Sequence, residues 1–255
     1  TGSGKTTTLY AFLRRINLTG SKIITIEDPI EYHLKGINQT QVNREKKYTF
    51  LSGLRSALRQ DPDIIMVGEI RDGETAKIAI NSSLTGHLVL STLHTNNAAG
   101  TIPRLIDLGV NPKIISSALT IAIAQRLVRK LCPACKKSVE LTAEEKALLT
   151  EVTESIKLKR QDIVAPVIGQ IFEAVGCLAC NGSGYKGREG IFEAILMDEA
   201  VAKITTENPD EKEIRRAAIP QGILDMRQDG ILKVLNGRTS LEELRRVIDL
   251  TAEII

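Results

Sequence analysis

The chain begins with TGSGKTTTLYAFL, in which Gly2, Gly4, Lys5 and Thr6 match the end of the phosphate-binding pattern G-x-x-x-x-G-K-[ST]. The first glycine of that pattern would precede Thr1. Glycines permit the backbone geometry that turns successive N–H groups toward phosphate oxygens, and a helix that follows adds the positive end of its dipole. The alternative is a chance glycine turn before a helix. A true loop of this kind joins a strand to a helix, and it therefore restricts the chain to an α/β fold.

Strand-like and helix-like segments alternate over the first 130 residues. Short apolar, β-branched runs predict strands buried on both faces, and these runs lie at 22–26, 63–68 and 87–93. Apolar residues at three- and four-residue spacing predict helices over 49–60 and 73–86, the second of which ends at Gly86. Alternation of this kind predicts a mostly parallel sheet with helices on both faces and ligands at the carboxyl ends of its strands.

The composition is that of an ordinary globular protein. Of 255 residues, 42% are apolar and 25% are charged, while tryptophan is absent. The net charge of +3 is too small to argue for nucleic acid or an anionic membrane. No apolar run is long enough to span a bilayer, and we see no secretory leader. These features together predict a cytosolic α/β protein.

Acidic residues follow two of the predicted buried strands. Glu27 and Asp28 end the strand over 22–26, and Glu69 comes just after the strand over 63–68. An ATPase needs carboxylates in such positions, because one set holds the metal's water shell and another polarises the attacking water. The alternative for each acid taken singly is an ordinary solvated strand end. Two such strands beside a phosphate loop favour the functional interpretation.

His87 begins the predicted strand over 87–93, and His94 follows it. Seven residues separate them, and an odd offset in an extended strand puts the two side chains on opposite faces. A shared metal is therefore not expected, and separate roles fit better, one of them sensing a γ-phosphate. A structural hydrogen bond is the alternative for either histidine.

The four cysteines form two C-x-x-C pairs separated by 41 residues. Two such knuckles suit one closed, structural tetrahedral zinc site with ligands Cys132, Cys135, Cys177 and Cys180. A redox pair and free structural cysteines are the alternatives. Because aromatic residues are scarce near this site, we do not expect it to bind nucleic acid.

The region around the cysteines predicts an inserted helical subdomain. Thr142 and Glu145 have capping-box spacing within it, and the glycine-rich run CNGSGYKGREG at 180–190 predicts a loop. Short helices are expected over 191–255, with starts at Asn208-Pro209 and at Ser240 with Glu243. The resulting division is a core over 1–130, a tetracysteine metal-binding subdomain over 131–190 and a C-terminal helical subdomain over 191–255.

Four segments in this order resemble the four motifs of the secretion ATPase superfamily: TGSGKTTTLY, ITIEDPIEY, LRQDPDIIMVGEIRD and GHLVLSTLHTN. They are similar to its Walker A motif, aspartate box, Walker B motif and histidine box. The run AQRLVRKLC and the cysteine pairs resemble the type II secretion and type IV pilus assembly branches rather than the retraction ATPases. The resemblance covers almost the whole chain and implies a RecA-like P-loop NTPase core, an inserted zinc subdomain and a small C-terminal helical region.

The resemblance also implies roles for individual residues. Glu27 would be the water-activating base, Glu69 would organise Mg²⁺ and its water, and His94 would complete the catalytic set. Thr6 would ligate Mg²⁺. Nucleotide contacts would come from the loop residues and two residues outside the loop: Thr1, Gly2, Ser3, Gly4, Lys5, Thr6, Thr7, Asp28 and His87. Further candidates for nucleotide or subunit contacts are Arg55, Arg59 and Arg126.

The same resemblance implies ATP, Mg²⁺ and Zn²⁺ as cofactors and a homo-hexameric ring as the working form. The ring would act on an inner-membrane platform protein from the cytoplasmic face of the membrane, with membrane contact only through partners and no nucleic acid. The family's preceding domain supplies arginines to the site, so the chain alone is expected to bind nucleotide weakly and hydrolyse little. The alternatives are a related DNA-translocating or conjugation ATPase and a nucleotide-binding module without hydrolysis.

Overall fold

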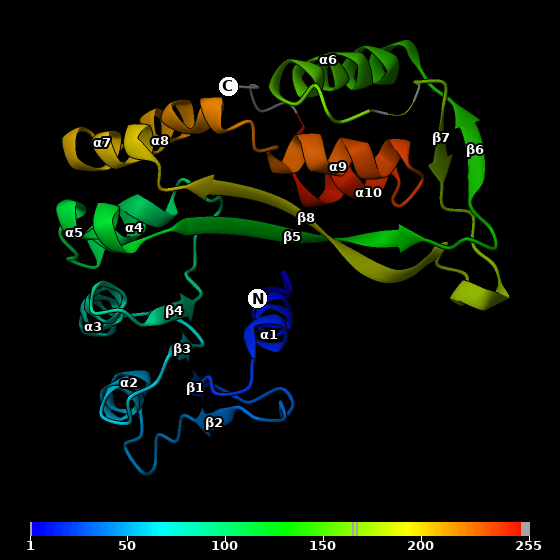
Figure 1. Cartoon of the computed structure of the whole chain (residues 1–255). Helices are drawn as coiled ribbons and strands as arrows, with labels where there is room; N and C mark the ends of the chain where they lie inside the picture. The colour runs from blue at the N-terminus through cyan, green and yellow to red at the C-terminus, as the bar shows by residue number, and fades with distance from the viewer. Residues whose placement is uncertain (1, 165, 167, 251–255) are drawn as a thin grey trace. The chain divides into compact units, whose positions relative to one another are not determined.

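The computed structural model describes residues 2–164, 166 and 168–250 (Figure 1). The chain groups into two compact units. Unit 1 comprises Thr1–Gly4, Ile123–Ile195 and Ala218–Ile255, and unit 2 comprises Lys5–Ala122 and Leu196–Ala217. These limits differ from the boundaries expected at 130 and 190, and the three-part division stays a prediction.

A parallel four-stranded sheet forms the centre of unit 2. Its order is β2-β1-β3-β4, and every neighbouring pair is parallel. Every residue of β1 and of β3 is buried, as their apolar β-branched sequences require. The three predicted strands are confirmed, but the expectation that all are buried is wrong for β4, whose residues are exposed or half-buried because it lies at an edge of the described sheet. Strand β2 is an additional, polar edge strand. The bounds are β1 Ile23–Glu27, β2 Asn38–Gln41, β3 Ile64–Val67 and β4 Leu88–Ser91.

Helices cover both faces of this sheet, as predicted. Figure 1 shows α1 on one face and α2 and α3 on the other. Residues next to α2 and α3 in the sequence cap these helices. At the start of α2 and of α3, the Thr49 and Asp72 side chains each accept a backbone N–H, and Gly86, with φ of 100°, follows the end of α3. Helix α5 packs against α3 and α7. The bounds are α1 Lys5–Ile16, α2 Phe50–Leu58, α3 Gly73–Leu84, α4 Thr101–Asp107, α5 Pro112–Ala118, α7 Glu199–Glu207 and α8 Glu211–Ala218.

Unit 1 has its own apolar core, built around Val128, Leu149, Ile171, Ile191 and Leu244. Long strands β5 and β8 pair with each other, and β6 pairs antiparallel with β7. Helix α9 packs against α6, α10 and β7. The bounds are β5 Ile121–Leu131, β6 Lys137–Glu140, α6 Ala143–Lys159, β7 Gln170–Glu173, η1 Leu178–Cys180, β8 Tyr185–Leu196, η2 Ile219–Gln221, α9 Met226–Leu235 and α10 Leu241–Val247.

The expectation of a loop over 180–190 is wrong for its second half, which lies in β8. Pairing with β5 satisfies the backbone groups that a glycine-rich run would otherwise expose to water. Gly187 keeps a φ of 79° within this strand, a conformation that glycine adopts without steric cost. The helices expected over 191–255 begin only after β8 ends at Leu196.

The predicted helix starts in unit 1 are confirmed. Thr142 and Glu145 form the expected capping box, and the Ser240 hydroxyl accepts the backbone N–H of Glu243. In unit 2, α8 begins two residues after Pro209, with the Asp210 carboxylate accepting the N–H of Lys212. Among the described residues, every helix is too short or too polar to cross a membrane.

Glu243 is fully buried in unit 1 and is held by two arginines. Arg129 donates its backbone N–H and two guanidinium N–H groups to this carboxylate, and Arg246 donates two more. Burial opposes ionisation, but these donors outweigh it and lower the pKa of Glu243 to about 2. The Arg129 guanidinium also lies 4.1 Å from the ring centroid of Tyr185. This cluster joins β5, β8 and α10.

We expect Glu243→Gln to lower the free energy of unfolding at pH 7 by about 3 kcal/mol, because it leaves two cations facing a neutral group. A carboxyl whose folded pKa is depressed stabilises the protein above its unfolded pKa, near 4.5, and loses that contribution as pH falls toward 2. The difference between wild type and variant should therefore shrink over this window in urea titrations at several pH values. Glu242→Gln on the exposed side of α10 is the matched control. A constant difference down to pH 2 would contradict this account.

Candidate functional site

The phosphate loop leads directly into α1. Gly2 and Gly4 have φ angles of 84° and 85°, which other residues rarely adopt. A Cβ at Gly4 would also lie 2.7 Å from the Gln125 side-chain nitrogen, so the Gln125 side chain would have to move to accommodate it. Lys5 is the first residue of α1, and Thr6 and Thr7 lie in its first turn. Thr1 lies outside the described residues. The described part of the loop has the glycine conformations and the helix that binding a phosphate requires.

Glu69 and His94 meet beyond the carboxyl ends of β3 and β4. His94 Nε2 lies 2.9 Å from one Glu69 carboxylate oxygen, and Arg71 donates to the other oxygen. The hydrogen bond from Arg71 is the main cause that lowers the pKa of Glu69, and the hydrogen bond from His94 lowers it further. Glu69 is therefore ionised at neutral pH, with its side chain 14% exposed. An ionised carboxylate in this position can orient a water molecule or a hydrated cation.

The two acids of the predicted aspartate box lie in different surroundings. Asp28 is exposed. The pKa of Arg71 is raised chiefly by its hydrogen bond to Glu69, and the negative charge of Asp28 raises it further, so Asp28 lies near this ion pair. Glu27 is only 2% exposed. Its carboxylate accepts from Tyr10, from Thr25 at 2.5 Å and from Gln39 at 3.0 Å. The structure thus gives Asp28 access to solvent and surrounds Glu27 with protein donors.

His87 does not join this group. It precedes β4, so it lies at the amino end of that strand, while His94 follows the carboxyl end. Its Nδ1 atom lies 3.0 Å from the Ser82 carbonyl oxygen and 3.3 Å from the Thr85 hydroxyl. The two histidines are therefore in separate environments, as their spacing predicted, and the nucleotide contact expected for His87 stays a prediction.

Each of the three candidate arginines makes a contact within the chain. Arg55 pairs with Glu74 across α2 and α3, and both side chains are more than half exposed. Arg59 caps the end of α2 through its backbone, and Arg126 reaches the Gln125 carbonyl oxygen at 3.5 Å. Their proposed nucleotide or subunit contacts stay predictions.

Sequence reasoning missed the residues that hold the acids. Tyr10 lies on α1, fully buried, and donates its hydroxyl to Glu27, so burial and this carboxylate raise the pKa of Tyr10 well above its usual range. Gln39, on the edge strand β2, donates to the same carboxylate. Arg71 is two residues from Glu69 in the sequence, and that proximity was the one available signal. Nothing in the spacing of Tyr10 or Gln39 indicated their contacts.

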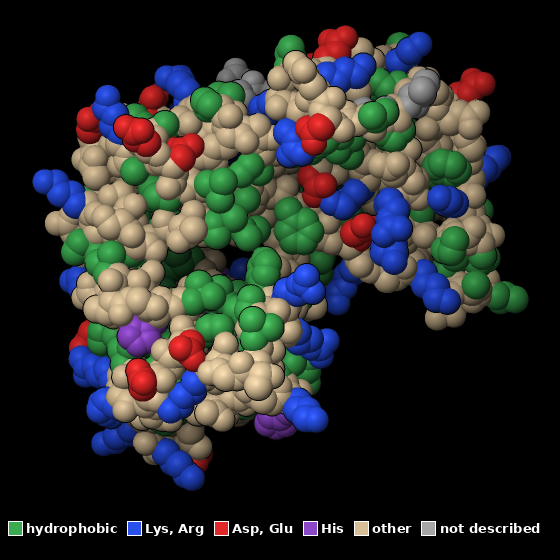
Figure 2. Space-filling view, viewed as in Figure 1, with side chains coloured by type: hydrophobic (Ala, Val, Ile, Leu, Met, Phe, Trp, Pro, Cys, Tyr) green, Lys and Arg blue, Asp and Glu red, His purple; other side chains and the backbone are tan. Residues whose placement is uncertain are grey.

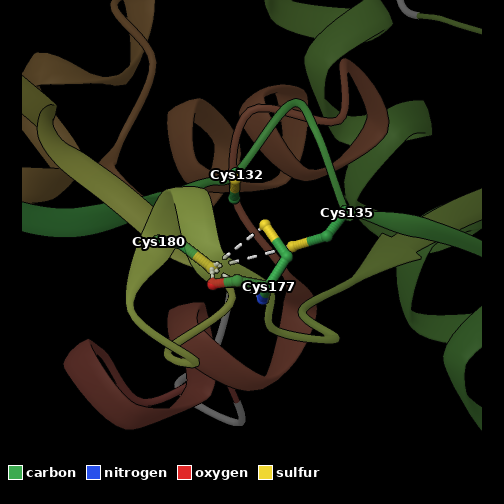
Figure 3. A group of neighbouring side chains, drawn as sticks. All are labelled: Cys132, Cys135, Cys177 and Cys180. Atoms are coloured by element: carbon green, nitrogen blue, oxygen red, sulfur yellow. Dashed lines mark hydrogen bonds between the residues drawn. The ribbon is translucent and has the colours of Figure 1, made fainter.

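The four cysteines converge in unit 1, as Figure 3 shows. Cys132 follows β5, Cys135 precedes β6, Cys177 follows β7 and Cys180 ends η1 just before β8. Their sulfur atoms all lie within 4.8 Å of one another, and two Sγ–Sγ distances are 3.8 Å. A tetrahedral zinc with bonds of about 2.3 Å places its sulfur ligands about 3.8 Å apart. The thiols are free rather than disulfide-bonded, and their arrangement fits one tetrahedral ion.

Backbone donors favour a thiolate at Cys180. Burial would raise the pKa of this thiol, but the N–H groups of Cys177 and Gly184, at 3.1 and 3.2 Å from its Sγ atom, outweigh it, and the pKa is lowered to about 6. Burial and the neighbouring thiols raise the pKa of Cys135 to about 12. One thiolate is thus ready to bind a cation, whose charge would favour loss of the remaining protons.

Comparison with known proteins identifies the family. A profile described as "Type II/IV secretion system protein" matches residues 1–246. The chain belongs to this family. The resemblance seen in the four motifs is thereby confirmed over nearly the whole sequence.

Two similar proteins are longer than this chain. The type II secretion system protein E of Pseudomonas aeruginosa is 51% identical over 97% of the chain, which covers 47% of that protein. The type IV pilus assembly ATPase PilB of Myxococcus xanthus is 44% identical over 96% of the chain, which covers 42% of it. The chain therefore spans about half the length of the curated relatives it matches.

Solved structures of related proteins share the fold. The crystal structure of the pilus retraction motor PilT with bound ADP has a TM-score of 0.67 and 29% identity, covering 99% of this chain and 59% of that chain. The ATPase DotB of Legionella pneumophila has a TM-score of 0.63 and 26% identity, covering 96% and 57%. These likenesses, with the parallel sheet, confirm the predicted RecA-like P-loop core.

We expect the purified chain to contain one zinc ion and Cys180→Ser to contain none, because the variant removes the sulfur that the backbone donors hold as thiolate. The midpoint of thermal unfolding should fall by roughly 5 °C or more. Metal content by mass spectrometry and a calorimetric scan check both effects. Ala134→Ser, at an exposed position of the first knuckle, is the control. Wild-type protein that holds no metal and has four titratable thiols would contradict the assignment.

Proposed function

We propose that the chain is the ATP-hydrolysing motor region of a type II secretion or type IV pilus assembly machine. Membership of the family and likeness to ATPase structures support this proposal. The observation that carries it is the ionised Glu69, held between Arg71 and His94 beyond the carboxyl ends of two parallel strands. A nucleotide-binding module without hydrolysis would not need this arrangement.

Each part of the site has a chemical task. Bound ATP and Mg²⁺ supply the transferable phosphoryl group and the charge of the metal. The N–H groups of the loop from Gly2 to Gly4 bind phosphate oxygens, Lys5 neutralises their charge, and the Thr6 hydroxyl holds the metal. Glu69 orients water, and His94 donates its Nε2–H to the Glu69 carboxylate and so holds it in place. Electrostatic positioning of this kind carries most of the rate in phosphoryl transfer.

Glu27 is the base that the family motif implies, and its contacts favour a different contribution. Tyr10, Thr25 and Gln39 already donate to its carboxylate, and it is nearly inaccessible to water. We propose that Glu27 holds α1 against the end of β1 and so positions the phosphate loop, while Glu69 faces the reacting water. Single Glu27→Gln and Glu69→Gln variants separate the two roles, because only the second should leave nucleotide affinity unchanged.

The working assembly is proposed by analogy with the family. We infer a homo-hexameric ring on the cytoplasmic face of the inner membrane, where it acts on a membrane platform protein. Zinc bound by the four cysteines would hold the two knuckles together and take no part in hydrolysis, since a closed four-thiolate site leaves no position for substrate.

Glu69→Gln should reduce ATP turnover by about 10²-fold or more while ATP still binds, because the amide keeps the shape but loses the charge. Lys5→Ala should lose binding as well as turnover. Phosphate release and equilibrium binding of a labelled ATP analogue provide the two measurements, and Glu74→Gln, which alters an exposed ion pair, is the control. Unchanged turnover in Glu69→Gln would overturn the proposal. Turnover that rises with added DNA would favour the conjugation-type alternative.

A chain extended at its amino end by the family's preceding domain should hydrolyse ATP at least about tenfold faster than this chain. The reason is that the family's preceding domain supplies further cations to the phosphates. Steady-state turnover per active chain is the measurement. Equal rates for the two chains would contradict the expectation that the site is incomplete.

A further inference from the structure

A basic cavity lies next to the first cysteine knuckle in unit 1. Its volume is about 570 Å³, which is within the range of small-molecule sites, roughly 300–1,000 Å³. Four cationic side chains line it: Lys130, Lys136, Lys186 and Arg238. On the face seen in Figure 2, Lys and Arg side chains gather over the region of β5, β8 and α10. The nucleotide chemistry proposed above does not use this cavity.

Little in the protein neutralises these cations. Arg238 is paired with Glu189 through two hydrogen bonds of 3.0 Å. Lys136 donates to the Gly237 carbonyl oxygen at 2.9 Å and lies over the Phe172 ring. Within the described ranges, no carboxylate lies within ion-pair distance of any of the three lysines. The cavity therefore carries four positive charges against the single negative charge of Glu189.

These features favour a polyvalent anion as ligand. Lysine ammonium groups are compact point charges that bind phosphate from several directions, whereas a planar carboxylate is better matched by an arginine fork. The one arginine of the cavity already has its carboxylate. We propose that this cavity binds a phosphate group, carried either by a soluble phosphate compound or by a lipid headgroup.

The same lysines could instead balance the charge of the neighbouring metal centre, since four thiolates around one divalent ion leave two negative charges. The hydrogen bonds around Cys180 and Lys136 do not support that role. Within the described chain, the hydrogen bonds to Cys180 Sγ from outside the cysteine side chains come from the backbone N–H groups of Cys177 and Gly184. Lys136 directs its ammonium group to Gly237 instead.

The test uses the whole chain with Lys5→Ala in every sample, so that the phosphate loop does not contribute to binding. The double variant Lys130→Gln/Lys186→Gln is compared with Lys146→Gln/Lys157→Gln, which removes the same charge from exposed positions of α6 in the same unit. Calorimetric titration with inorganic pyrophosphate at constant ionic strength forms one arm. Co-sedimentation with phosphatidylcholine vesicles, with and without phosphatidylglycerol, forms the other.

We expect the double variant to lose roughly tenfold or more in affinity in at least one arm, while the control loses little. A loss with pyrophosphate identifies a soluble phosphate ligand, and a loss confined to the anionic vesicles identifies a lipid headgroup. Equal affinities of the two double variants in both arms would overturn the proposal. So would loss of zinc from the Lys130→Gln/Lys186→Gln protein, because the lysines would then serve the metal centre. Because the phosphate loop is disabled throughout, failure of the proposed ATPase activity does not affect this result.

Discussion

The parallel pairing of β1, β3 and β4 is the constraint on which the candidate active site depends. Because the three strands run in the same direction, the residues that follow each one come to the same edge of the sheet. That arrangement brings Asp28 near Arg71 and Glu69 to His94, although 25 residues separate the last two in the sequence. An antiparallel partner would have sent one of them to the opposite edge. The chemistry of the site is thus a consequence of strand direction.

Glu27 and Glu69 both lie at the carboxyl end of a buried strand, but their side chains have different surroundings. Glu27 is the last residue of β1, and its side chain turns into the protein, where Tyr10 of α1 reaches it. Glu69 lies two residues beyond β3 and turns toward His94. Three uncharged donors join Glu27 to α1, β1 and β2, whereas Glu69 is held by an arginine and a histidine, which supports the catalytic role proposed for it. The distinction depends on where each strand ends.

Much of this fold could be predicted from local patterns, because buried strands and capped helices leave strong signals. Residue type and spacing predict β1, β3, β4, α2, α3, the Thr142 capping box and the tetracysteine cluster. The long β5–β8 pair could not be predicted, since its residues alternate weakly and Gly187 and Gly190 suggest a loop. The contacts of Tyr10 and Gln39 with Glu27, and the Arg129–Glu243 ion pair, could not be predicted either. Each depends on contacts between residues far apart in the sequence, which no local spacing encodes.

The two cysteine knuckles enclose residues 136–176, a closed loop of 41 residues that includes β6, α6 and β7. A crosslink of this kind limits the freedom of the unfolded chain only while an ion joins its ends. If the thiols hold zinc, the stability of unit 1 depends on the supply of free metal, rising with the logarithm of its concentration above the dissociation constant. The free energy of unfolding of unit 1 would then be higher in a metal-replete cell than during metal starvation.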